Sequence, residues 1–246
     1  YSSEKVHILD QWIDFRMMQL INQVTEGLDK YELDRASRPI ADFIEDLSTW
    51  YLRRSRSSLE SLPHLRFVLL TLSKIMAPFM PFMAEDIHQR LKGEDEKESV
   101  HLEEWVGASV YAVDSYKLKK MEETRALVTL ALEARSKANI KVRQPLQKLE
   151  IRNSKLEKEY LEIIKDELNV KMVTVDENLA EEVWLDTHIT PELEEEGKVR
   201  DAIRAVQEWR KENNLKPGEK AEYKTDNEFF LKHKEEIEKT TQVELT

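Results

Sequence analysis

Eight consecutive residues combine the side chains that proteins use to bind nucleic acid. The stretch from Thr49 to Arg56 holds three arginines and two large aromatic residues, on a chain whose formal net charge is −11. Arginine binds phosphate through two parallel hydrogen bonds and stacks on flat π systems, and aromatic rings offer stacking faces. The stretch is therefore suited to RNA. The alternative is a helix end with core aromatics and solvated or ion-paired arginines, since charged helix ends are common.

Helical position separates the members of this stretch by role. At 3.6 residues per turn, Tyr51 and Arg54 fall on the apolar side of the predicted helix and Trp50 falls on its flank. Arg53 and Arg56 fall away from the apolar side. We therefore expect Arg54 to be a structural, partly buried ion-pair partner. Arg53 and Arg56 are the candidates for phosphate or base contacts, with Trp50 as a candidate stacking residue.

A second basic segment follows later in the chain. Residues 119–152 contain nine basic and four acidic residues, a net charge of +5, and residues 49–74 carry +4. An acidic body with two basic segments fits a protein that touches RNA along a limited track, and it also fits ordinary variation of charge along a chain. Lys137, Lys141 and Arg143 form the second candidate RNA-binding cluster. The alternative is a solvated loop.

Composition limits the remaining possibilities. The 246 residues are 40% hydrophobic and 35% charged, with five glycines and seven prolines, which favours long helices in one large or two ordinary domains. The absence of cysteine excludes disulfides and thiolate metal sites, and the six histidines show no paired metal-ligand spacing. Asp186 and His188 are near neighbours, but a surface pair is a simpler interpretation than part of a catalytic triad. We expect no catalytic centre, metal site or cofactor within this chain.

Targeting signals are not evident in the sequence either. No apolar run approaches the ~18–20 residues of a membrane span, and no signal-peptide pattern opens the chain. The pattern predicts a cytoplasmic protein with no membrane partner. The first residue is Tyr1 rather than methionine, so we expect an excised piece of a longer protein. Nothing in the sequence indicates an oligomer.

Apolar periodicity predicts a mainly α protein in three parts. We expect residues 1–106 to form a four-helix bundle, residues 107–140 a linker and long helix, and residues 141–246 a small α+β domain. Pro39 either restarts or kinks the second helix, and residues 100–105 look like an extended piece whose Leu102 and Trp105 pack on the bundle. The predicted elements are helices near 9–28, 33–51, 65–76, 81–91, 116–138, 156–168, 190–213 and 229–237, and strands near 148–152, 171–175 and 182–186, with two more in the tail.

Several ordered motifs resemble one enzyme family. Residues 9–13, 46–56, 72–85 and 99–105 are similar to the anticodon-binding bundle of class I aminoacyl-tRNA synthetases, in the branch that handles isoleucine, valine and leucine. Residues 134–146 and 185–200 resemble the isoleucyl-tRNA synthetases within that branch. The motifs follow one another in order over nearly the whole chain, which makes the resemblance far more specific than any single motif.

The resemblance implies a larger parent enzyme that activates isoleucine with ATP and Mg²⁺ and joins it to its tRNA. Its partners would be isoleucine tRNA and the catalytic domain of the same parent chain. The HIGH- and KMSKS-type signatures of that catalytic domain are not in this sequence, so the fragment alone should neither use ATP nor aminoacylate. The implied role is to dock the anticodon stem-loop. The tRNA-binding candidates are Trp50, Arg53, Arg56, Lys137, Lys141 and Arg143.

Two other interpretations stay open at this point. A helical scaffold or protein-interaction domain without an RNA role explains the negative net charge more simply. The equivalent part of a valyl- or leucyl-tRNA synthetase would share the bundle.

Overall fold

A computed structural model describes residues 8–55, 61–107, 115–152, 154–216 and 218–246. The chain divides into two compact units, Tyr1–Met121 and Glu122–Thr246, and the boundary falls inside a long helix. The protein is mainly α with small sheets, as the sequence predicts. None of the helices in the described ranges is long and apolar enough to cross a membrane.

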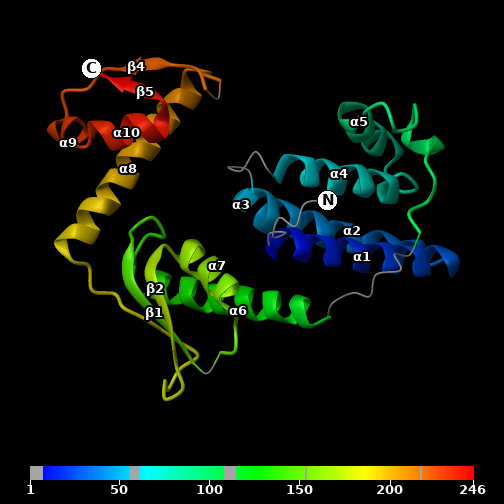
Figure 1. The fold of residues 1–246 in the computed structure, drawn as a ribbon, viewed down its shortest axis with the longest axis horizontal. Coiled ribbons are helices and arrows are strands. Elements are labelled where there is room, and N and C mark those ends of the chain that lie inside the picture. The colour runs from blue at the N-terminus through cyan, green and yellow to red at the C-terminus, as the bar shows by residue number, and fades with distance from the viewer. Residues whose placement is uncertain (1–7, 56–60, 108–114, 153, 217) are drawn as a thin grey trace. The chain divides into compact units, whose positions relative to one another are not determined.

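The first unit is built from four long helices, which confirms the predicted bundle (Figure 1). They are α1 (Ile8–Asp29), α2 (Leu33–Asp46), α4 (Leu62–Met76) and α5 (Pro81–Leu91). Residues at steps of three and four form the buried face of α1, because that spacing returns to one side of a helix. Those buried residues are Leu9, Trp12, Ile13, Met17, Leu20, Ile21, Val24 and Gly27.

Helices α1 and α2 cross closely at a glycine. A Cβ atom added to Gly27 would lie 2.8 Å from the Cβ of Ala36 and 2.9 Å from its Cα. Real side-chain atoms do not approach this closely, so the crossing requires glycine on α1 and a small residue on α2. Ala36 is fully buried as a result.

The second helix runs through Pro39 without restarting and then changes geometry. A π-helical turn, η1 (Leu47–Leu52), follows directly, and a short helix α3 (Arg53–Ser55) continues the same path. A π-helix accommodates one extra residue in its turn and is rare in proteins. The regular α-helical geometry assumed for the arginine stretch is therefore wrong over these six residues.

The segment after α5 is a 3₁₀ turn rather than the extended piece expected from the sequence. The turn is η3 (Val100–Leu102), and the carboxylate of Glu85 accepts bonds from Ser99 Oγ and the Val100 amide, each 2.9 Å long. Leu102 is 62% exposed, so its expected packing on the bundle is wrong. The Trp105 indole nitrogen donates to Thr25 Oγ1 on α1 over 3.0 Å.

The second unit contains a three-stranded sheet packed on helices. Helix α6 (Ser115–Lys137) enters it from the unit boundary, and α7 (Lys158–Leu168) connects two of its strands. The strand order is β2-β1-β3, with β1 (Leu146–Arg152) parallel to β2 (Val170–Asp176) and antiparallel to β3 (Val183–Leu185). Buried residues of β1 and α7 form the core between sheet and helix: Leu149, Ile151, Tyr160, Ile163, Ile164 and Leu168.

The chain ends in a small α+β assembly on helix α8 (Pro191–Glu212). Thr190 Oγ1 accepts a bond from the Leu193 amide, which confirms the predicted N-cap. The remaining elements are β4 (Ala221–Tyr223), α9 (Glu228–Lys232), α10 (Lys234–Thr241) and β5 (Val243–Leu245), with β4 and β5 parallel. Their shared apolar core comprises Ala202, Val206, Ile237, Val243 and Leu245.

Candidate nucleic-acid interface

The π-helical turn divides the arginine stretch between core and surface. Tyr51 is fully buried, Trp50 and Arg54 are half-buried, and Arg53 is exposed. Arg56 lies outside the described residues. The guanidinium of Arg53 therefore lies on the surface two residues after Tyr51, an aromatic residue that is held in the core.

A buried hydrogen bond anchors the turn to the first helix. The Tyr51 hydroxyl donates to Asp10 Oδ1 over 2.7 Å, and burial together with this carboxylate raises the pKa of the hydroxyl far above its usual value. Next to it, His64 Nε2 lies 3.1 Å from Asp14 Oδ1, and this interaction raises the pKa of the imidazole. These four side chains join the starts of α1 and α4 to the π-turn.

Side-chain hydroxyls satisfy backbone carbonyls around the same turn. Thr49 Oγ1 donates to the Glu45 carbonyl over 2.7 Å, and Ser55 Oγ donates to the Tyr51 carbonyl over 2.8 Å. Hydroxyls that bond back to a carbonyl one turn earlier distort helices. Single π-turns occur frequently at functional sites. The hydroxyls of Thr49 and Ser55 thus bond to the backbone around this turn.

The second candidate cluster lies in the loop that follows α6. Lys137 occupies the last turn of that helix, and Asn139 then takes the left-handed conformation, with φ 55°. Lys137 and Lys141 are exposed, whereas the side chain of Arg143 is 36% exposed and its Nε lies 3.0 Å from Asp201 Oδ1. The structure thus brings the three predicted basic residues together at one end of α6.

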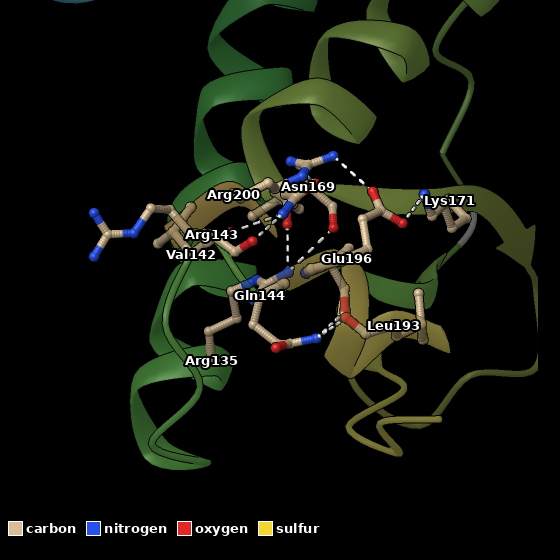
Figure 2. A network of polar contacts seen from close by, with 11 residues as sticks. Arg135, Val142, Arg143, Gln144, Asn169, Lys171, Leu193, Glu196 and Arg200 are labelled. Carbon is tan, nitrogen blue, oxygen red and sulfur yellow. Dashed lines mark hydrogen bonds and ion pairs between the residues drawn. The ribbon is translucent and has the colours of Figure 1, made fainter. Parts of the chain in front are cut away.

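A buried arginine lies beneath this loop, where Figure 2 shows its contacts. Arg135 is 1% exposed, and its guanidinium donates to four backbone carbonyls. The acceptors are Lys141 at 2.9 Å, Gln144 at 3.0 Å, Leu168 at 2.5 Å and Asn169 at 3.4 Å. Burial lowers the pKa of Arg135 to about 10, so the group is still charged at neutral pH.

Asn169 ties the same loop to two other elements. It caps α7 in the left-handed conformation, with φ 52°, a geometry that asparagine tolerates better than most residues. Its side-chain amide donates to the carbonyls of Val142 and Arg143 over 3.2 and 2.8 Å. Its Oδ1 accepts a bond from Arg200 on α8 (Figure 2).

Gln144 closes the loop against the first turns of α8. Its Nε2 donates to the Leu193 carbonyl over 2.6 Å. A Cβ atom at Gly197 would collide with the side-chain amide of Gln144, so glycine there leaves room for the present position of the glutamine. Gln144 and Gly197 belong to the two synthetase-like motifs at residues 134–146 and 185–200, and they lie next to each other in the structure.

The arginine stretch at the π-turn and the basic loop after α6 are both suited to bind anions. Exposed cations on a fixed backbone can hold phosphate groups, and a half-buried tryptophan beside an exposed arginine can support a stacked base. Asp186 accepts a bond from the backbone amide of His188 over 3.0 Å, which assigns that acid to a turn. Within the described ranges, no group of three histidine, aspartate or glutamate residues is placed to hold a metal ion.

Sequence reasoning did not assign roles to Arg135, Gln144, Asn169 and Gly197. An asparagine between a predicted helix and a predicted strand is a recognisable signal for a left-handed cap. Its bonding partners, however, lie 26 and 27 positions earlier in the chain. Periodicity and spacing carry no information on contacts of that kind.

Comparison with known proteins places this fold in a family. The family model for the anticodon-binding domain of tRNA ligases matches residues 10–151, a range that covers almost all of the bundle, α6 and β1. The chain therefore belongs to the family of anticodon-binding domains of tRNA ligases.

Several curated relatives of this chain are named isoleucine–tRNA ligase. The relative from Clostridium acetobutylicum is 35% identical over 234 residues, which is 87% of this chain and 22% of the relative. Relatives from Clostridium kluyveri and Chlamydia trachomatis are each 38% identical, over 206 and 179 residues. The chain thus spans about a fifth of the length of the curated relatives that it matches.

Proposed function

We propose that this chain is the tRNA-binding portion of an isoleucine–tRNA ligase and that it docks the anticodon stem-loop of isoleucine tRNA. In the parent enzyme it would position that tRNA for a separate catalytic domain, which uses ATP and Mg²⁺. The chain by itself would not aminoacylate. We also propose that the parent enzyme acts in the cytoplasm.

The observation that carries this proposal is the family match over residues 10–151. That range includes both basic clusters, around Arg53 and around Lys141. The names of the relatives support isoleucine over valine or leucine. Unpaired anticodon bases can stack on aromatic or guanidinium planes, while lysine and arginine neutralise phosphates.

Replacing Arg53 and Arg56 together with alanine tests the proposed interface. Log affinity falls as log salt concentration rises. Each lost phosphate contact should reduce the steepness of that fall by ~0.7–0.9, because fewer counterions are released on binding. We expect affinity for isoleucine tRNA to fall about tenfold or more at moderate salt. Fluorescence titration of the purified chain at two salt concentrations, with isoleucine tRNA and a noncognate tRNA, would measure both quantities.

Arg35 and Arg38 provide a matched control on helix α2. Both are exposed and pair with neighbouring acids, Arg35 with Glu32 at 3.0 Å and Arg38 with Asp34 at 3.3 Å. Their joint replacement by alanine removes the same charge and should change tRNA affinity far less. Equal losses in the two double variants would show a general charge effect and would remove Arg53 and Arg56 from the site.

The scaffold alternative makes a different prediction in the same experiment. A helical interaction domain with no RNA role would bind neither tRNA at either salt concentration. A valine- or leucine-specific relative would prefer the corresponding tRNA over isoleucine tRNA. ATP–pyrophosphate exchange with isoleucine by the isolated chain would contradict the proposed division of labour with a catalytic domain.

A further inference from the structure

The loop after α6 is held through four of its backbone carbonyls, in addition to the ion pair of Arg143 with Asp201. Arg135 holds the carbonyls of Lys141 and Gln144, and Asn169 holds those of Val142 and Arg143. Four consecutive residues of the loop are thus each bonded through a carbonyl to a side chain elsewhere in the unit. The amide of Gln144 also donates to the Lys141 carbonyl over 3.0 Å, which closes a turn.

The fixed backbone carries an exposed Lys141 and a half-buried Arg143, whose Nε is paired with Asp201. Figure 2 shows the guanidinium of Arg143 pointing away from the Arg135 network, and Lys141 is exposed. Preorganised groups bind more tightly, because less conformational entropy is lost when the ligand arrives. A loop of this construction therefore presents its cations at low entropic cost.

The buried arginine also contributes charge to the same surface. All four acceptors of its guanidinium are backbone carbonyls, which orient the cation without neutralising it. In a low-dielectric environment such a charge acts over a longer distance than a surface charge does.

We propose that Arg135 and Asn169 are positioning residues of an RNA-phosphate surface formed by Lys137, Lys141 and Arg143. This inference rests on the proposed tRNA-binding function and adds two residues that would never touch the ligand. Arg135 fixes the backbone of the loop from its buried side and supplies part of the positive electrostatic potential at its surface. Asn169 keeps the two middle residues of the loop in register with the end of α7 and with Arg200 on α8.

The variant Asn169→Gly tests this role with little risk to the fold. Glycine adopts the left-handed conformation at least as readily as asparagine, so the substitution removes the amide clamp and keeps the cap. Asn214 provides the matched control, because it is also left-handed, with φ 55°, after the end of α8. Asn214→Gly makes the same chemical change away from the basic loop.

Two readouts on the full chain separate positioning from simple stabilisation. Amide hydrogen exchange at Gln144 reports whether the loop opens, and titration with isoleucine tRNA at several salt concentrations reports phosphate contacts. We expect Asn169→Gly to speed exchange at Gln144 and to weaken tRNA binding about threefold to tenfold with a shallower salt slope. Asn214→Gly should leave both unchanged. All titrations are made below the onset of thermal unfolding of each variant.

The result that would overturn the inference is a clear one. If Asn169→Gly binds tRNA with the affinity and salt slope of the unaltered chain, while the triple alanine variant of Lys137, Lys141 and Arg143 binds weakly, the surface exists but needs no positioning. If the unaltered chain fails to bind tRNA, the proposed function fails as well. The two failures are therefore distinguishable in one set of titrations.

Discussion

At the scale of single residues, buried polar side chains decide where the candidate binding groups lie. Asp10 holds Tyr51, and through it the π-turn that directly precedes Arg53. Arg135 and Asn169 hold the loop that carries Lys141 and Arg143 in the same indirect way. In both places the residues that would meet RNA depend on residues that would not.

The tyrosine anchor can be tested by removing one oxygen atom. Tyr51→Phe leaves the ring in the core but deprives the Asp10 carboxylate of its 2.7 Å donor. A partly buried carboxylate that loses its hydrogen-bond donor destabilises the folded state, so we expect a loss of about 1–3 kcal/mol in the free energy of unfolding. Urea denaturation followed by circular dichroism would measure it.

Tyr31 supplies the control for that substitution, because it is 91% exposed. Tyr31→Phe should change stability by less than ~0.5 kcal/mol, as expected for surface positions. Similar stability for both variants would mean that the hydroxyl of Tyr51 contributes nothing to the bundle.

The sequence predicted whether a residue is buried or exposed better than it predicted which residues contact it. Helical position identified Tyr51 as a core residue and Arg54 as partly buried, and both are so in the structure. Asp10 and His64 were not identified as neighbours of Tyr51, since they lie 41 and 13 positions away and no local pattern links them. Periodicity reports which side of a helix is buried, and only the fold reports what lies opposite.

At the scale of elements, the period of apolar residues predicted nearly every helix and strand. The first helix, the proline-initiated α5 and the capped α8 were all identified, because their signals are local. The π-turn at residues 47–52 was not, because the spacing of Leu47 and Tyr51 fits a regular α-helix equally well. Tyr51 still fell on the predicted side, because a step of four from Leu47 returns to the core in both geometries.

The close crossing of α1 and α2 makes a prediction at this scale. Gly27→Ala would place a Cβ 2.9 Å from the backbone of Ala36, which cannot move without moving its helix. We expect a loss of about 1–3 kcal/mol in the free energy of unfolding from overpacking, despite the better helix propensity of alanine. Thermal or urea denaturation monitored at the helical signal would measure it.

Gly107→Ala is the corresponding control, because nothing lies within 4 Å of a Cβ added there. Its stability should match that of the unaltered chain or slightly exceed it. If Gly27→Ala were equally stable, the two helices would have to separate more easily than their packing indicates.

At the scale of the whole molecule, an acidic chain carries a net positive charge in two limited segments. The net charge of −11 would keep RNA away from most of the surface, whereas residues 49–74 and 119–152 carry net positive charge. Charge counts alone did not separate an RNA-binding protein from an acidic scaffold. Ordered motifs over most of the chain, and then the family match over residues 10–151, made the difference.

The central claim is that this chain recognises the anticodon stem-loop of a tRNA, and hydroxyl-radical footprinting tests it most directly. The measurement compares backbone cleavage of isoleucine tRNA with and without a saturating amount of the purified chain. We predict protection concentrated in the anticodon stem and loop, and its loss in the Arg53→Ala, Arg56→Ala double variant. Protection centred on the acceptor stem, or the absence of any protection at concentrations that saturate binding, would contradict the account.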